Sequence, residues 1–75
     1  MNGIGWAVKQ MLDGKKVRRS GWNGVGMFIV YTPGLATQPF NTRPCITMWT
    51  AQKEWQPGWL CSQADLLAID WEIAE

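Results

Sequence analysis

The chain contains no histidine and only two cysteines. Histidine is the side chain that most often serves as a general base near neutral pH, so its absence removes the commonest route to acid–base catalysis. A structural zinc site uses four nitrogen or sulfur ligands, and two cysteines without histidine fall short of that number. The sequence therefore predicts no metal, no cofactor and no catalytic residue, and it favours a binding protein over an enzyme.

Long apolar runs are also missing. The N-terminus has no apolar stretch typical of a signal peptide, and no segment is long enough to span a bilayer. Cys45 and Cys61 are too few for the dense disulfide framework of small secreted domains. We therefore expect a cytoplasmic protein in which both thiols are reduced.

The net charge of +1 is small. Binding to duplex nucleic acid depends on many cationic contacts to phosphates, and this charge gives no reason to expect it. Apolar residues are plentiful instead, with 47% hydrophobic residues and six tryptophans, which excludes intrinsic disorder.

Residues 1–75 are expected to form a single domain with a thin core. A chain of this length buries only roughly 60% of its unfolded surface. Small scaffolds usually compensate with disulfides, a metal or a partner subunit. With the first two set aside, the sequence favours a homo-oligomer.

The N-terminal segment has the periodicity of a short helix. Asn2 is a candidate N-cap, and Gly14 is a candidate C-terminal stop. Apolar residues at spacings of three and four form one helical face: Ile4, Ala7, Val8, Met11 and Leu12.

The rest of the chain alternates between strand-like runs and turn signals. Asn23-Gly24 is a strong hairpin signal, widened by its flanking glycines. Strands are expected at residues 15–19, 27–31, 45–50 and 70–74, a loop at 32–44, a turn at 52–54 and an interrupted return strand at 55–59.

Ser62 is expected to begin a second helix, with Asp65 three residues later in the pattern of a capping box. Leu66, Leu67 and Ile69 are expected to supply the apolar side of this helix. The predicted fold is α+β: a small antiparallel sheet of about four strands with two short helices.

The segment from Arg18 to Met27 is the most informative part of the chain. Glycine permits sharp bends and the close approach of a ligand, and here glycines flank Trp22 and Asn23. Arginine suits phosphate, but Arg18 and Arg19 alternate along a strand, so only one is expected to face a given pocket. The alternative is a tight turn beside a solvated, charged strand edge.

Six tryptophans are too many for one thin core. Trp6, Trp59 and Trp71 suit core positions, whereas Trp22, Trp49 and Trp55 are expected to be partly exposed. Exposed aromatic residues indicate a binding site or a subunit interface, and both hold if a pocket lies between subunits.

The predicted helix start at residues 62–65 has backbone donors suited to an anion. Helix capping accounts for Ser62 and Asp65 without a ligand, but it does not account for Gln63. Asp65 and Asp70 are five residues apart, off a shared helical face, and form a poor pair for acid–base catalysis.

Two separated motifs in this order resemble the second Thoeris anti-defence family of phages. The first runs from Asp13 to Arg19 and on through Gly21-Trp22-Asn23-Gly24-x-Gly26-Met27-Phe28. The second comprises Met48-x-Thr50-Ala51, Trp59 and the segment from Ser62 to Glu72. The resemblance covers nearly the whole chain and is weakest at residues 32–44.

The resemblance implies a sponge that binds a host immune signal, a glycocyclic form of ADP-ribose, and holds it intact in the host cytoplasm. It also implies a homotetramer with pockets between subunits, and cyclic di- or trinucleotides as further ligands. The residues that match the motifs, or supply charge beside them, are Arg18, Arg19, Trp22, Asn23, Gly24, Met27, Thr50, Ser62, Gln63 and Asp65.

The chain departs from the family pattern after Met48. A lysine and an Asp-Gly turn are typical there, whereas this chain has Trp49 and Gln52-Lys53. Two other classes of function remain open: a module that binds single-stranded nucleic acid or protein through exposed tryptophans, and a purely structural small subunit.

Overall fold

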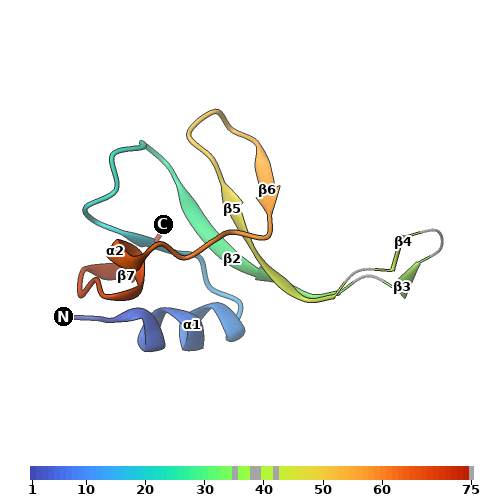
Figure 1. Ribbon diagram of the computed structural model, residues 1–75, viewed down its shortest axis with the longest axis horizontal. Helices are drawn as coiled ribbons and strands as arrows, with labels where there is room; N and C mark the ends of the chain where they lie inside the picture. The colour runs from blue at the N-terminus through green and yellow to red at the C-terminus, as the bar shows by residue number, and fades with distance from the viewer. Residues whose placement is uncertain (35, 38–39, 42, 75) are drawn as a thin grey trace.

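The computed structural model describes residues 1–34, 36–37, 40–41 and 43–74. Its elements follow the order α1 (Ile4–Leu12), β1 (Val17–Arg19), β2 (Phe28–Thr32), β3 (Ala36–Thr37), β4 (Phe40–Asn41), β5 (Cys45–Trp49), β6 (Trp55–Pro57), α2 (Gln63–Leu66) and β7 (Trp71–Ile73) (Figure 1). The main sheet has five strands in the order β6-β5-β2-β1-β7, and every neighbouring pair is antiparallel. The α+β prediction is confirmed, with one strand more than expected.

Helix α1 begins and ends close to where the apolar periodicity places it. Gly14 adopts φ +88°, so it ends the helix in the left-handed conformation that glycine tolerates. The prediction for Asn2 is wrong, because Gly3 is the N-cap. Asn2 instead donates its side-chain N–H to the carbonyl of Trp71 and forms a parallel bridge with Asp70, which joins the N-terminus to β7.

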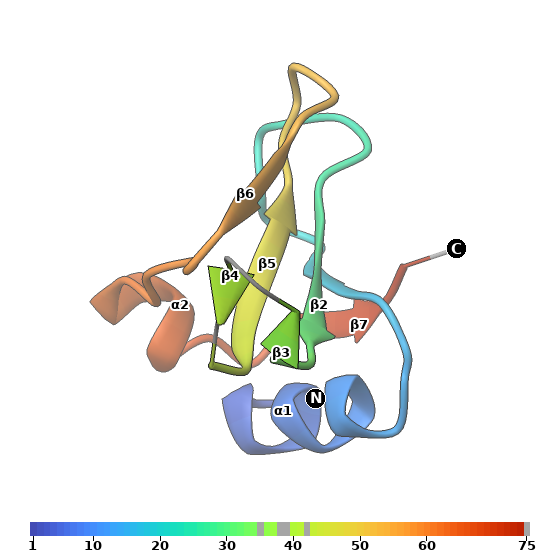
Figure 2. The ribbon, with the colours of Figure 1, turned by 90° about the vertical axis from the view of Figure 1, so that its right-hand side faces the viewer.

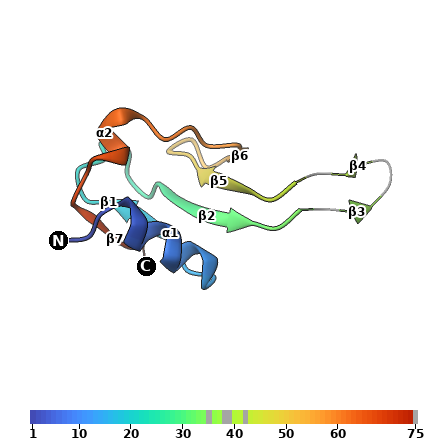
Figure 3. The same ribbon diagram turned by 60° about the horizontal axis from the view of Figure 1, so that its bottom comes forward.

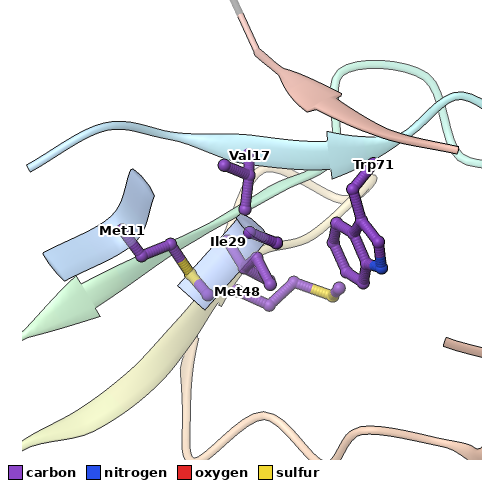
Figure 4. Close-up of a cluster of buried hydrophobic side chains, with 6 residues drawn as sticks. Met11, Val17, Ile29, Met48 and Trp71 are labelled. Carbon is purple, nitrogen blue, oxygen red and sulfur yellow. The ribbon is translucent and has the colours of Figure 1, made fainter. Parts of the chain in front are cut away.

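The core lies between α1 and one face of the sheet. Val17 pairs with Ile29, and Ile29 pairs with Met48, so these side chains share a face. Figure 4 shows them with Met11 and Trp71 in one cluster. Among the residues whose burial the structure describes, six hydrophobic ones are buried and form a small core: Ala7, Met11, Val17, Ile29, Met48 and Trp71.

The other face of the sheet carries an aromatic group that we call the outer cluster: Phe28, Trp49 and Trp55. Cross-strand pairing places Phe28 opposite Trp49 and Trp49 opposite Trp55. The ring centroids lie 4.8 to 6.3 Å apart. Trp55 is 55% exposed, as its position near a turn predicts.

The prediction of a simple loop at residues 32–44 is wrong where the structure describes that segment. Ala36–Thr37 pairs with Phe40–Asn41, so the connection between β2 and β5 is a hairpin extending beyond the sheet, as Figure 3 shows. Two antiparallel strands that lead into one connection bring its two arms side by side, which favours pairing despite the prolines. Residues 35, 38, 39 and 42 lie outside the described part.

The predicted apolar side of the second helix is also wrong. Helix α2 spans four residues, and Leu66, Leu67 and Ile69 are 44%, 75% and 57% exposed. A single turn is too short to present an apolar stripe, and the small side chain of Ala68 packs against the core in their place. Figure 2 shows α2 to one side of the sheet. Within the described residues, no helix has the length and apolar character needed to cross a membrane.

Candidate functional site

A groove of about 280 Å³, which we call the loop groove, lies where the connection between β1 and β2 folds over the end of β1. The connection is wider than a two-residue turn, as its glycines predict. Six of the ten predicted site residues line this groove. The full lining is Arg18, Arg19, Ser20, Trp22, Asn23, Gly24, Val25, Gly26, Met27 and Glu72.

Arg19 is held by two carboxylates from the C-terminal part of the chain. Its Nε donates to Oδ1 of Asp70 at 2.7 Å, and its Nη1 donates to Oδ1 of Asp65 at 2.9 Å. These hydrogen bonds, Asp70 first, raise the pKa of the Arg19 guanidinium above its ordinary value. The two aspartates are thus brought onto one arginine, an ion-pair network that their spacing in the sequence did not indicate.

Asp65 connects α2 to the loop groove. Its Oδ1 also accepts the indole N–H of Trp22 at 3.0 Å, and its backbone N–H donates to Ser62 Oγ at 3.1 Å. Burial raises the pKa of Asp65, but the hydrogen bonds from Trp22, Arg19 and Ser62 outweigh it, so the pKa lies below its ordinary value. The carboxylate is therefore charged near neutral pH, and its Oδ1 accepts hydrogen bonds from both Arg19 and Trp22.

Asp70 anchors the start of the loop. Its Oδ2 accepts the backbone N–H of Gly21 at 2.8 Å and lies 3.3 Å from Ser20 Oγ. The hydrogen bond from Arg19 lowers the pKa of Asp70. A Cβ added to Gly21 would lie 2.8 Å from Oδ2, so glycine permits this approach. This anchoring role is not evident from the sequence, since the two partners are 49 residues apart.

Trp22 belongs to an aromatic group that we call the inner cluster: Trp22, Trp59 and Trp71. The Trp22 and Trp71 rings meet edge to face with centroids 5.4 Å apart, and Trp59 lies 6.3 Å from Trp22 and 6.2 Å from Trp71. Trp71 Nε1 donates to the backbone carbonyl of Asp65 at 3.2 Å. Trp22 is thus fixed by packing while it lines the groove, and Trp71 is a core residue as predicted.

Arg18 points to the opposite side of β1 from Arg19. Its Nε donates to Oε2 of Glu72 at 2.8 Å, and these side chains are 43% and 40% exposed. The two arginines bond to different carboxylates, as strand alternation predicts. Both nevertheless contribute to the wall of the loop groove, so the prediction that only one would face a pocket is wrong.

Gly24 and Met27 lie at the end of the groove nearest the β5–β6 turn. A Cβ on Gly24 would collide with the Met27 side chain and lie 3.2 Å from Cβ of Ala51. Thr50 does not line the groove: its Oγ1 accepts the backbone N–H of Glu54 at 3.2 Å and closes the turn beside it. Thr50 therefore adjoins the groove through Ala51.

The start of α2 also lies outside the lining of the groove. Ser62 is occupied as the helix N-cap, and Gln63 is an exposed first-turn residue. Asp65 contacts the groove residues Arg19 and Trp22 from behind. Of the three predicted site residues at the start of α2, only Asp65 thus lies beside the groove, whereas Ser62 and Gln63 lie farther from it on the same segment.

A second, apolar groove of about 420 Å³ lies on the open face of the sheet, beside the outer cluster. Sequence reasoning did not identify it, because its residues come from separated strands. Its lining is Val30, Thr32, Pro33, Arg43, Cys45, Thr47, Trp55 and Pro57. Its hydroxyls are engaged with each other, since Thr32 Oγ1 donates to Thr47 Oγ1 at 2.7 Å. The loop groove is the more polar of the two and offers the better choice of hydrogen-bonding groups.

The chemistry offered by the loop groove suits binding. Guanidinium, carboxylate, amide and indole groups meet there, which can hold a planar, anionic ligand. Partial burial and the charge of Asp65 raise the pKa of the Cys61 thiol, which disfavours its thiolate form. Within the described residues, no cluster of three acidic or cysteine side chains is placed to hold a metal ion.

Comparison with known proteins identifies the family of the chain. No curated protein matches the chain. A family model described as the Thoeris anti-defense 2-like domain matches residues 2–74, which spans both motifs and the residues of the loop groove. The chain therefore belongs to the Thoeris anti-defense 2-like domain family.

Proposed function

We propose that this protein sequesters an intact cyclic ADP-ribose-type immune signal in the loop groove and thereby blocks host Thoeris immunity. The observation that carries the proposal is the gathering of Trp22, Asn23 and Met27 with two arginines around one groove, within a chain of this family. Arginine forks suit phosphate, and an indole edge or face suits a base or sugar. The two groove residues that could serve as a base or a nucleophile are engaged within the protein, Glu72 with Arg18 and Ser20 with Asp70.

The size of the groove supports a site completed by a second subunit. Ligand sites usually enclose roughly 300–1,000 Å³, and the loop groove of one protomer, at about 280 Å³, lies at the lower limit of that range. Ser62 and Gln63 lie outside this groove, and Leu67 is 75% exposed beside them. We therefore propose a homo-oligomer, a tetramer by the family resemblance, in which the α2 segment of a neighbouring subunit brings its polar side chains to the groove.

The test uses the product that a Thoeris TIR-domain enzyme makes from its nucleotide substrate. Purified protein is mixed with the product, freed of excess ligand by filtration and then heated, and the released molecule is identified by chromatography and mass spectrometry. Recovery of the unaltered signal supports sequestration. Recovery of a breakdown product contradicts it and indicates a hydrolase.

Asn23→Ala is the matching variant, because Asn23 is an exposed loop residue that lines the groove. Loss of its amide is expected to weaken retention roughly tenfold, the effect of one good hydrogen bond to a charged or strongly polar group. Gln52→Ala is the control, since Gln52 is equally exposed on the neighbouring β5–β6 turn but does not line the groove. Native mass spectrometry of the same samples gives the number of subunits, and adding cyclic di- and trinucleotides tests them as further ligands.

A second candidate function is supported by the outer cluster. Trp49 and Trp55 lie on the open sheet face with Lys16 Nζ 4.8 Å from the ring centre of Phe28, an arrangement suited to stacking bases of single-stranded nucleic acid. This alternative predicts binding of oligonucleotides that weakens steeply with salt. Tryptophan fluorescence titrated with an oligonucleotide and with ADP-ribose separates the two functions.

A further inference from the structure

We propose that Arg18, rather than Arg19, meets the phosphate of a ligand in the loop groove, and that Glu72 competes with that phosphate and so determines which charges the groove accepts. The inference deepens the proposed function and rests on it. It assigns unequal roles to two adjacent arginines that side-chain chemistry alone leaves equivalent.

Arg19 has little to offer an anion. Its Nε and Nη1 are already committed to Asp70 and Asp65, and its side chain is 21% exposed. Two carboxylates around one guanidinium leave a local charge of −1, which repels phosphate. Moving Arg19 toward a ligand would also remove the partner of Asp65, whose carboxylate is only 13% exposed. Arg19 is therefore a structural cation.

Arg18 differs in each of these respects. It has one carboxylate partner, Glu72, and its bond to Glu72 uses Nε. No hydrogen bond of its Nη1 or Nη2 to another described residue accompanies that bond. These two nitrogens are the ones that form a parallel fork with phosphate oxygens. With 43% of its side chain exposed, Arg18 can turn into the groove without burying an unpaired charge.

The role of Glu72 follows from its position beside Arg18. Glu72 on β7 lies directly opposite Arg18 on β1, and it lines the same groove. A phosphate that engages Arg18 arrives beside a carboxylate that already holds this guanidinium at 2.8 Å. The carboxylate of Glu72 repels a phosphate bound at Arg18, because both groups are negatively charged. Glu72 therefore disfavours highly charged phosphates relative to ligands that carry less charge or present hydroxyl donors.

Isothermal titration calorimetry of the full chain with ADP-ribose and with uncharged adenosine tests the inference. Arg18→Gln is expected to weaken ADP-ribose binding roughly tenfold or more, the scale of one charge-assisted fork. Glu72→Gln is expected to tighten it roughly three- to tenfold at low ionic strength, with the gain shrinking as salt rises. Adenosine affinity is expected to stay the same in both variants. Lys15→Gln and Glu54→Gln, at exposed residues outside the groove, are the charge-matched controls.

The inference is overturned if Arg18→Gln binds ADP-ribose like the unaltered chain, if Glu72→Gln binds it equally or more weakly, or if the unaltered chain does not bind it. The two proposals fail separately. Retention of the TIR product alongside a failed ADP-ribose series leaves sequestration standing and removes the roles of Arg18 and Glu72. If the ADP-ribose series behaves as expected but the TIR product is not retained, the roles of Arg18 and Glu72 stand and sequestration is removed.

Discussion

The inner and outer clusters contain the same kind of side chain in opposite situations. In the inner cluster, Trp71 is 1% exposed, and the indole N–H groups of Trp71 and Trp22 both donate to Asp65. In the outer cluster, Trp55 is 55% exposed, and its ring meets that of Trp49 at 4.8 Å without an acceptor from the described residues for its indole N–H. Similar edge-to-face contacts thus occur in a core and on a surface.

The difference shows what burial of tryptophan requires in so small a domain. An indole carries a polar N–H that needs an acceptor once water is excluded. The segment around α2 supplies that acceptor to the inner cluster through the backbone and side chain of Asp65. Among the described residues, no corresponding segment lies over the outer cluster, and Trp55 keeps more than half of its surface exposed.

The largest expected effect separates the clusters directly. Trp71→Ala should lower the free energy of unfolding by about 3–5 kcal/mol, because it removes a fully buried ring and leaves a cavity. Trp55→Ala should lower it by less than about 1 kcal/mol in the protomer. Urea denaturation followed by circular dichroism measures both, with Trp71→Phe as a milder variant that stays folded. Comparable losses at the two positions would mean that the outer cluster is covered in the assembled protein.

The second prediction removes the side-chain acceptor of the inner cluster, so that Trp22 resembles the tryptophans of the outer cluster. Asp65→Ala should cost about 1–3 kcal/mol, because it leaves the indole N–H of Trp22 and one nitrogen of Arg19 without an acceptor. Tryptophan emission should shift to longer wavelength as Trp22 becomes hydrated. Ser62→Ala, which removes only the cap of α2, is the control and should leave the emission unchanged. An unaltered emission in Asp65→Ala would show that packing alone holds Trp22.

The third prediction concerns how the stability of the chain depends on pH through Asp65 and Asp70. The pKa values of Asp65 and Asp70 are lowered in the folded chain, so both carboxylates stabilise it above their ordinary pKa of 3.8, and that stability is lost as the pH falls below this value. Unfolding free energy measured from pH 6 to pH 2 should therefore drop at the acid end. Asp70→Asn should flatten this drop, whereas Asp13→Asn, at the exposed end of α1, should retain it. An unchanged profile in Asp70→Asn would place the acid sensitivity elsewhere.

The smallest expected effect concerns the hairpin that carries the outer cluster. Lys53 adopts φ +63°, in the left-handed region that glycine occupies without strain. Its N–H donates to the carbonyl of Thr50 at 2.9 Å, so the turn is closed around this conformation. Lys53→Gly should raise the melting temperature by a few degrees, equivalent to about 1 kcal/mol, without altering the emission of the inner cluster. Lys53→Ala, which keeps a Cβ, should give no comparable gain.

Local sequence signals were sufficient wherever neighbouring residues decide the structure. The apolar spacing that ends at Gly14 predicted α1, and Ser62 with Asp65 predicted the cap of α2. Alternation along β1 predicted that only one of Arg18 and Arg19 would face a pocket, whereas both line the loop groove. The prediction that Leu66 and Leu67 would be buried was wrong, because helical periodicity does not indicate whether a core lies beneath a helix.

The sequence by itself determined the α+β class, the end of α1 at Gly14, the cap of α2 at Ser62, the glycine-rich connection and the two motifs that mark the family. The tertiary structure decided which charges and rings meet. Arg19 is joined to Asp70 across 51 residues and to Asp65 across 46, and the choice of Arg18 as the cation left for a ligand depends on those pairs. Spacing along the chain carries no information about such contacts, because folding the sheet brings its first and last strands together.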